Sequence, residues 1–246
     1  MVRIIKKYEE RKKEIVDTAQ SLFYQKGYEK TSVNFIIETI GISKGTFYYY
    51  FKSKEDLLDS IVEEFTKEII SKLEPVVNNN SLDAITKLNE FYRQAGMYKA
   101  ENISLIKTLI NTLYNDKNLL LRYKMNKRAV ETTLPLLSKI FEQGKNEGSF
   151  DIEYPVETAR IILLFGTSMG EYNAKLMMSL DENPDNINEF QRHLNLYQMS
   201  VQRILGAPEG SIKIFDEQII DAIMEKYNET YMSRKQVGTH PSGRRA

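Results

Sequence analysis

The sequence predicts an all-α protein made of a small N-terminal helical domain and a larger helical domain that follows it. Apolar residues recur every three or four positions over most of the 246 residues, as they do on one face of an amphipathic helix. We find no run that alternates apolar and polar residues as a half-buried strand does. Charge separates the two parts, because residues 1–54 hold 11 basic and 6 acidic side chains whereas residues 55–233 hold 19 and 28. A basic domain joined to an acidic one suggests that only the first meets a polyanion.

Three short helices are expected at the N-terminal end. The first carries an apolar stripe and ends at Gly27, a residue suited to the left-handed position after a helix; its stripe comprises Ile15, Ala19, Leu22 and Phe23. Thr31 and Ser32 offer N-caps for a second helix that ends at Gly41. Ser43 caps the third helix, and Ser53 caps a longer fourth one.

The rest of the chain predicts longer helices separated by polar or glycine-containing loops. Pro135 is expected to kink or split one of these helices, because proline removes a helical hydrogen bond. Asn186 and Glu189 have the spacing of a capping box. We expect a domain boundary after residue 53, a second domain over 54–234 and a flexible basic tail over 235–246. The expected helices are approximately 54–77, 82–98, 102–113, 117–146, 155–181, 186–205 and 214–233.

Composition excludes several kinds of chemistry. The chain has no cysteine and two histidines, His193 and His240, so disulfides, thiol nucleophiles and cysteine-based zinc sites are ruled out. No cofactor or metal is expected. The charged N-terminal sequence does not resemble a signal peptide, and the apolar runs are much shorter than the roughly 20 residues of a membrane span. We therefore expect a soluble, cytoplasmic protein.

The third helix has two chemically different faces. A helix turns by about 100° per residue, so Phe47 and Phe51 share one face and should pack in the core. Gly45, Thr46 and Tyr49 fall on the opposite side. Tyr48 lies at the edge of this exposed face, and the position of Tyr50 is undecided between core and surface.

The exposed face has the chemistry of a DNA-contacting surface. Gly45 lets a phosphate or a base edge approach the backbone, and Thr46 can contact base edges or a thymine methyl group. Tyrosine can donate a hydrogen bond to phosphate, and lysine neutralises its charge. A short helix, a glycine-containing turn and such a helix together form the helix-turn-helix arrangement, whose second helix enters the major groove.

Four short motifs lie close together in the first sixty residues: Gly27-Tyr28, Thr31-Ser32, Gly41-Ile42-Ser43-Lys44-Gly45-Thr46-Phe47-Tyr48-Tyr49-Tyr50-Phe51 and Lys54-Glu55-Asp56-Leu57. Together they resemble the DNA-binding domain of tetracycline-repressor-like (TetR) regulators. The resemblance covers roughly residues 11 to 60. It implies DNA contacts from the start of the second helix, from the third helix and from the lysine that opens the fourth. Those roles fall on Ser32, Val33, Ser43, Lys44, Gly45, Thr46, Tyr48, Tyr49, Tyr50 and Lys54.

The same resemblance implies that the second domain binds a small effector and forms a homodimer through its last two major helices. Candidate dimer residues are Gly166, Gly170, Phe190, Leu194, Tyr197 and Val201, although packing within one subunit is the alternative for the glycines. An effector pocket should be largely apolar with a few polar groups. Its candidates, each of which is also compatible with ordinary core, are Tyr92, Met97, Asn111, Tyr114, Phe141, Phe165, Met169 and Tyr172.

Three functions are compatible with these patterns. The first is a ligand-responsive, homodimeric repressor that binds a palindromic DNA operator and is released by a small lipophilic effector. The second is a nonspecific architectural DNA-binding protein, which the neutral net charge disfavours because such binding depends on many basic contacts. The third is a helical enzyme with a DNA-binding appendage, for which we find no catalytic motif.

Overall fold

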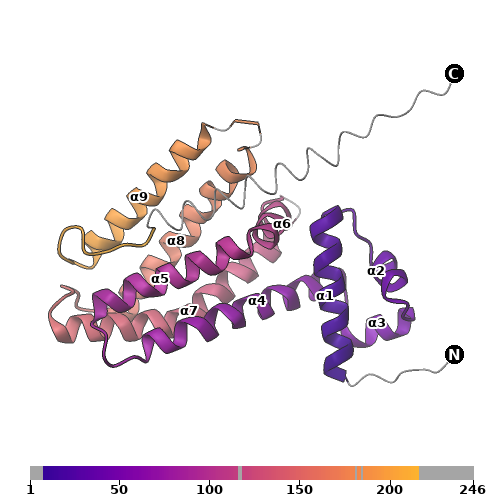
Figure 1. The fold of residues 1–246 in the computed structure, drawn as a ribbon, viewed down its shortest axis with the longest axis horizontal. Coiled ribbons are helices and arrows are strands. Elements are labelled where there is room, and N and C mark those ends of the chain that lie inside the picture. The colour runs from indigo at the N-terminus through magenta and orange to yellow at the C-terminus, as the bar shows by residue number, and fades with distance from the viewer. Residues whose placement is uncertain (1–7, 116–117, 181, 184, 216–246) are drawn as a thin grey trace. The chain divides into compact units, whose positions relative to one another are not determined.

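The computed structural model describes residues 8–115, 118–180, 182–183 and 185–215, and within these ranges it contains helices and no strand (Figure 1). The all-α prediction is confirmed. The helices are α1 Tyr8–Lys26, α2 Val33–Ile40, α3 Lys44–Tyr50, α4 Lys54–Val77, α5 Ala84–Glu101, α6 Ile103–Leu113, α7 Leu119–Glu147, α8 Pro155–Met178 and α9 Asn186–Ile204. The helix expected at 214–233 and the tail at 235–246 lie outside the described residues, apart from Ile214 and Phe215.

The chain divides into two compact units. Unit 1 comprises the described residues up to Ser71 together with Lys107–Ala129, and unit 2 comprises Lys72–Ile106 and the described residues from Val130 onward. The helix-turn-helix domain expected at 1–53 lies wholly inside unit 1. The C-terminal part of α6 and the N-terminal part of α7 both belong to unit 1.

Unit 1 is built on a small apolar core. The stripe expected on α1 is buried, as are side chains from α2, α3 and the first turns of α4. Thr31 is also buried, and its hydroxyl donates to the carbonyl of Gly27 at 2.9 Å, which secures the loop between α1 and α2. The buried apolar residues of unit 1 are Ile15, Val16, Ala19, Leu22, Phe23, Tyr28, Ile36, Ile37, Phe47, Phe51, Leu57, Leu58, Ile61, Leu109 and Met125.

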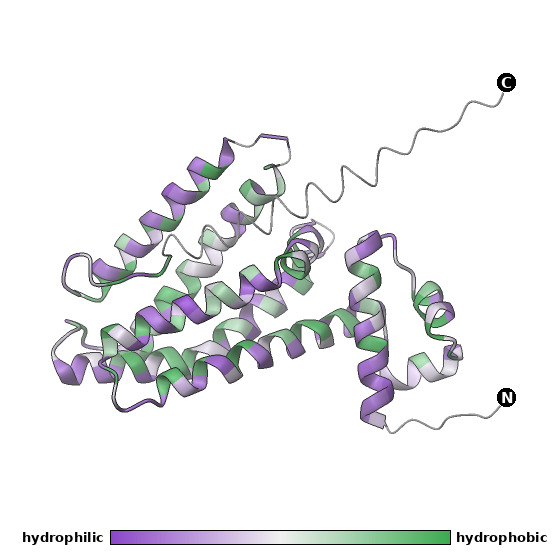
Figure 2. Cartoon of the chain, viewed as in Figure 1, coloured by the Kyte–Doolittle hydropathy of each residue, from purple (hydrophilic) through white to green (hydrophobic). Residues whose placement is uncertain are grey.

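Unit 2 packs amphipathic helices, whose green and purple residues alternate along their length in Figure 2. α8 lies against α9. A buried lysine, Lys87, donates to the carbonyl of Val77 at 2.8 Å and so satisfies an orphan acceptor in the last turn of α4. Asp83 caps α5 by accepting from the backbone N–H of Thr86 at 2.9 Å, and this bond lowers the pKa of the Asp83 carboxyl.

Two local expectations need correction. Of the two outcomes expected at Pro135, a kink or a split, the split is wrong, since α7 runs unbroken from Leu119 to Glu147. The capping box at Asn186 and Glu189 is wrong, because the N-cap is Asp185 and no side chain caps the helix. Asn186 instead donates to Ser179 Oγ at 2.6 Å, and Glu189 accepts from the Tyr172 hydroxyl at 2.9 Å. Both side chains therefore bond to residues of α8 or of the turn after it and do not cap α9.

Candidate nucleic-acid interface

The turn between α2 and α3 is built by three local features. Ser32 caps α2 by accepting from the backbone N–H of Phe35 at 3.1 Å. Gly41 ends the helix with a φ of 74°, a left-handed conformation that glycine adopts without steric cost, and its N–H donates to Ile37 O at 2.9 Å. Ser43 then caps α3 by accepting from the N–H of Thr46 at 3.0 Å. These caps confirm the helix-turn-helix predicted from the sequence.

The two faces of α3 are as predicted. Phe47 and Phe51 are 0% and 1% exposed, so they anchor the helix in the core of unit 1. Tyr48 and Tyr49 are 47% and 72% exposed. Thr46 is half-buried, and its hydroxyl shares a 2.8 Å hydrogen bond with Ser43 Oγ. The exposed face of α3 is therefore available to a partner.

Tyr50, which the sequence left undecided, lies between the two faces. It is half-buried, and its ring centroid is 4.8 Å from that of Tyr8 and 5.1 Å from that of Tyr49. Tyr8 had no role in the sequence prediction. Its contact with α3 joins residues far apart in the chain, so no local pattern could have revealed it.

Gly45 has space around it. A Cβ atom built at this position would have Ser43 Oγ as its nearest neighbour, at 3.8 Å, which is an ordinary van der Waals distance. The φ of Gly45 is not positive, so the backbone does not require glycine either. Glycine in a helix costs about 0.5–1 kcal/mol relative to alanine. The unbound protein therefore gains no stability from glycine at this exposed position.

Lys54, the first residue of α4, is held in place by Tyr28. Its Nζ donates to the Tyr28 carbonyl at 3.0 Å and lies 4.0 Å from the centroid of the Tyr28 ring. Burial raises the pKa of the Tyr28 hydroxyl, and the carboxylates of Glu55 and Glu29 raise it further. The ammonium group of Lys54 is thus fixed near the start of α2, where the exposed Ser32 and the half-buried Val33 lie.

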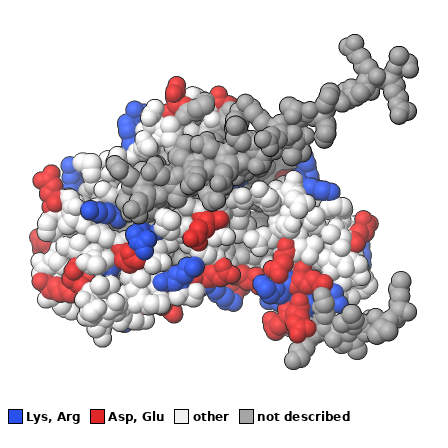
Figure 3. All heavy atoms as spheres, viewed as in Figure 1, with Lys and Arg blue, Asp and Glu red and all other residues white. Residues whose placement is uncertain are grey.

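Lysines lie close to α3 in the chain, whereas charges of both signs lie on the face of the molecule in Figure 3. Lys44 and Lys52 are exposed at the two ends of α3. On the face drawn in Figure 3, the described Lys and Arg side chains lie among Asp and Glu side chains. The N-terminal part of the sequence has more basic than acidic residues, but on the face drawn in Figure 3 this excess does not produce a uniformly basic surface.

The expected pocket residues are divided between the two units. Asn111 and Tyr114 belong to unit 1, and the other candidates belong to unit 2. Phe141 is fully buried against Phe150, with ring centroids 5.8 Å apart, as in ordinary core. Tyr172 lies at the surface, where its hydrogen bond to Glu189 raises its pKa. The half-buried candidates of unit 2 are Tyr92, Met97, Phe165 and Met169.

The apolar stripe expected to bind a second copy is buried within one chain. Phe190, Leu194 and Tyr197 of α9 are almost inaccessible, and Val201 is 0% exposed. Gly166 packs against the same helix, since a Cβ there would lie 3.0 Å from the Tyr197 hydroxyl, whereas a Cβ at Gly170 would meet no atom within 4 Å. The exposed apolar side chains of the two helices are others: Val156, Ile161, Leu164, Tyr172, Met178, Leu196, Met199 and Ile204. The spacing of three between Ile161 and Leu164, and between Leu196 and Met199, is the sequence signal for this second face.

The described residues offer neither a metal site nor a membrane-spanning helix. They contain no group of three or more His, Cys, Asp or Glu side chains placed to hold a metal ion. None of their helices combines the length and the apolar character needed to cross a membrane.

Comparison with known proteins gives a consistent result. Residues 15–61 match the family described as "Bacterial regulatory proteins, tetR family". The chain is 28% identical over 158 residues to the fatty acid metabolism regulator protein of Bacillus subtilis, covering 63% of this chain and 77% of that protein. It is 26% identical over 154 residues to the HTH-type transcriptional repressor KstR2 of Rhodococcus jostii, covering 61% and 72%.

A solved structure shares the fold of both units. The FadR transcriptional regulator of Bacillus subtilis in complex with stearoyl-CoA aligns with a TM-score of 0.56 at 24% identity. The alignment covers 75% of this chain and 96% of that one. The similarity therefore extends well beyond the 15–61 segment.

Proposed function

Because the chain belongs to the TetR family of bacterial transcriptional regulators, we propose that it is a homodimeric repressor that binds a palindromic DNA operator and is released by a small lipophilic effector. α3 would enter the major groove, and the start of α2 and Lys54 would contact the flanking phosphates. Such a protein acts where the chromosome is, in the cytoplasm. No catalytic step is part of this proposal.

The exposed face of α3 carries the proposal. Phe47 and Phe51 fix the helix, so Tyr49 can remain 72% exposed without the helix losing its place. An exposed tyrosine beside an unobstructed glycine suits close contact with DNA, because the ring can reach a base or a phosphate while the backbone approaches at Gly45. In the unbound protein the glycine adds no stability to the helix, and Tyr49 buries little of its ring.

Operator binding by a homodimer requires two α3 helices separated by one turn of DNA, about 34–36 Å. We propose that α8 and α9 make the dimer contact, because Ile161, Leu164, Leu196 and Met199 are exposed on them. Two such helices from each copy make a four-helix interface. Gly170 has room for a helix of the second copy to approach closely.

A lipophilic effector is suggested by the relatives. One is named a fatty acid metabolism regulator, and another was solved with stearoyl-CoA. We propose that the effector binds in unit 2 beside the half-buried side chains of α5 and α8, namely Tyr92, Met97, Phe165 and Met169. Burial raises the pKa of the Tyr92 hydroxyl, and the neighbouring Tyr197 hydroxyl raises it further.

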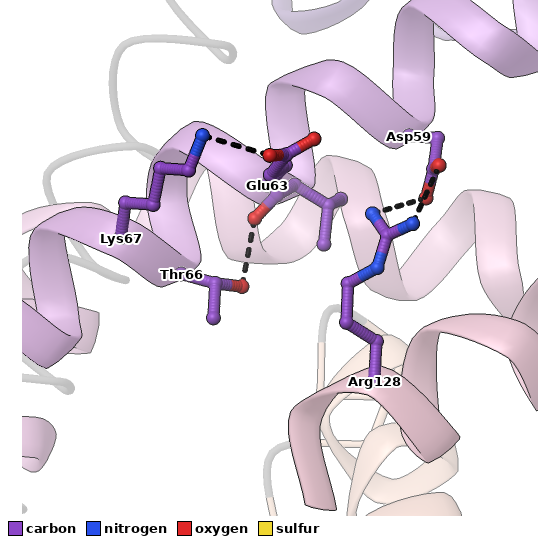
Figure 4. Close-up of polar contacts among 6 residues, drawn as sticks. Asp59, Glu63, Thr66, Lys67 and Arg128 are labelled. Carbon is purple, nitrogen blue, oxygen red and sulfur yellow. Dashed lines mark hydrogen bonds and ion pairs between the residues drawn. The ribbon is translucent and has the colours of Figure 1, made fainter. Parts of the chain in front are cut away.

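A bidentate ion pair joins α7 to α4, the helix that begins at the DNA-binding surface. Arg128 Nη1 and Nη2 donate to Asp59 Oδ1 and Oδ2 at 2.9 and 3.0 Å (Figure 4). Glu63 lies one turn further along α4 and pairs with Lys67 at 2.7 Å. We propose that this contact transmits movements of α7 to α4, and through it to α3.

Sequence-specific binding is the first test. A DNA duplex that the protein enriches from a random library should bind, by fluorescence anisotropy, roughly a thousandfold more tightly than a duplex of the same bases in shuffled order. Tyr49→Ala should weaken binding to the enriched duplex strongly while changing the melting temperature little, because the Tyr49 ring is mostly exposed. The control Tyr24→Ala removes an exposed tyrosine of α1 and should leave binding to the enriched duplex unchanged. Equal affinity of the wild-type protein for both duplexes would refute the proposal.

The effector is tested by thermal shift. Fatty acids and acyl-CoA thioesters should raise the melting temperature of the free protein, and the enriched duplex should reduce their affinity, because coupling between two binding sites is reciprocal. A compound that stabilises the protein equally with and without DNA is not the effector. If every stabilising compound behaves in that way, ligand release is the wrong mechanism.

A further inference from the structure

Three tyrosine rings from two helices form a closed cluster at the edge of the α3 surface. Tyr8 begins α1, and its ring centroid lies 4.8 Å from that of Tyr50 and 5.9 Å from that of Tyr49. The Tyr49 and Tyr50 rings are 5.1 Å apart at an angle of 87°, an edge-to-face arrangement. The separations are all within the range in which aromatic pairs attract one another.

The cluster supplies what the core anchors of α3 lack. Phe47 and Phe51 lie one turn apart on the same side of the helix, so their contacts run along a single line parallel to its axis. A helix held along one line resists translation but can still roll about that line. α3 has 7 residues, so its orientation depends on tertiary contacts.

Tyr50 is placed to stop such a roll. It lies about 60° around the helix from Phe47, away from the line of the two phenylalanines. Its ring rests on Tyr8, which belongs to a helix whose middle is firmly buried through Ile15 and Val16. Since a roll of α3 would carry Tyr49 and Gly45 around the axis, this contact sets the angle at which the exposed face meets a partner.

Tyr8 itself gains little burial from the contact. It is 46% exposed, nearly the same as Tyr24 at 45%, another tyrosine of α1. A large apolar ring at the surface contributes little to the core, so the value of Tyr8 lies in where it holds Tyr50 and Tyr49. The contact joins α1 to the α3 surface directly and does not pass through α2.

We propose that Tyr8 is a positioning residue for DNA recognition: its ring holds Tyr50 and Tyr49 so that the exposed face of α3 has a single orientation in the major groove. This inference rests on the proposed function. Tyr8 acts through the two tyrosines and does not itself read a base. Loss of the ring lets α3 roll, which spoils base contacts while phosphate contacts persist. Specific binding should therefore suffer more than nonspecific binding.

The test compares Tyr8→Ala, Tyr8→Phe and the control Tyr24→Ala in the full-length protein. The probes are the duplex enriched by the wild-type protein from a random library and its shuffled counterpart, both measured by fluorescence anisotropy. We expect Tyr8→Ala to weaken binding to the enriched duplex by roughly 3- to 10-fold per half-site, the loss of one or two aromatic contacts, which is about 10- to 100-fold for a dimer on two half-sites. Binding to the shuffled duplex should change by less than about twofold. Tyr8→Phe and Tyr24→Ala should match the wild-type protein on both.

A double-mutant cycle with Tyr50→Ala isolates the contact. If Tyr8 acts through Tyr50, adding Tyr8→Ala to Tyr50→Ala should cause much less further loss than Tyr8→Ala causes alone. Full additivity would overturn the inference. So would an equal loss on both duplexes, which indicates a general loss of structure, or a Tyr8→Phe defect as large as that of Tyr8→Ala, which indicates a direct contact by the hydroxyl.

The wild-type measurements separate this inference from the proposal beneath it. If the wild-type protein enriches no duplex, the proposed function fails. If it enriches a duplex and Tyr8→Ala binds that duplex as tightly as the wild-type protein does, only the role of Tyr8 fails.

Discussion

Gly45→Ala should make the protein more stable and a poorer DNA binder. The new Cβ would have Ser43 Oγ at 3.8 Å as its nearest neighbour, so it introduces no clash in the unbound protein. Alanine is better than glycine in a helix by about 0.5–1 kcal/mol. For a chain of this size, that gain raises the melting temperature by about 1–4 °C.

The same methyl group stands where we propose that DNA approaches the backbone of α3. A displaced contact of this kind costs about 1.4 kcal/mol or more, which is about tenfold in Kd for one half-site. A homodimer carries the change at two distant sites, where free-energy changes add, so the loss on a palindromic operator should reach roughly a hundredfold. Binding to the shuffled duplex should change less, because it depends on charge.

Differential scanning calorimetry and anisotropy titration on the same preparation measure both effects. The opposite signs make the prediction demanding, since ordinary structural damage lowers stability and affinity together. A variant that is more stable and binds the operator with wild-type affinity would show that Gly45 does not face DNA. A lower melting temperature would show that the space around Gly45 is needed by the unbound protein.

The remaining predictions concern other parts of the molecule. Lys54→Ala should weaken binding to all duplexes and reduce the slope of log Kd against log salt concentration by about one. Its melting temperature should fall, because the bond to Tyr28 is lost. An unchanged slope would show that Lys54 does not contact a phosphate. In α8, Gly166→Ala should lower the melting temperature, because the new Cβ would lie 3.0 Å from the Tyr197 hydroxyl. Gly170→Ala should raise the melting temperature of the monomer and weaken the dimer in sedimentation equilibrium. An unchanged dimer dissociation constant would place Gly170 outside the interface. Arg128→Met should lower the free energy of unfolding by no more than about 1 kcal/mol, because the ion pair with Asp59 is partly exposed. It should also reduce the effect of the effector on operator affinity. An unchanged effect would show that this ion pair does not couple the effector site to the DNA-binding surface.

The features of α3 that the sequence predicted depend on local geometry. Ser43 caps the helix, and Phe47 and Phe51 share its buried face, because backbone hydrogen bonding and a turn of about 100° per residue determine both. The exposure of Tyr49 follows from the same periodicity. Such features need no knowledge of the rest of the chain.

Apolar periodicity was less informative for α9. It predicted an apolar face that includes Val201, but periodicity does not distinguish a face that packs within one chain from a face that meets a second copy. The structure buries Val201 inside the chain and leaves Leu196 and Met199 exposed. It also explains Gly166, whose neighbour is the Tyr197 hydroxyl on a different helix.

By itself, then, the sequence determined the helices, the serine caps of α2 and α3 and the two faces of α3, because neighbours in the chain control these through backbone geometry. The tertiary structure decided which side chains meet across helices. Tyr8 met Tyr50, and Asn186 left its predicted cap for Ser179. These pairings depend on how separate helices pack, and the free energy of packing is set by contacts between residues that no local pattern relates.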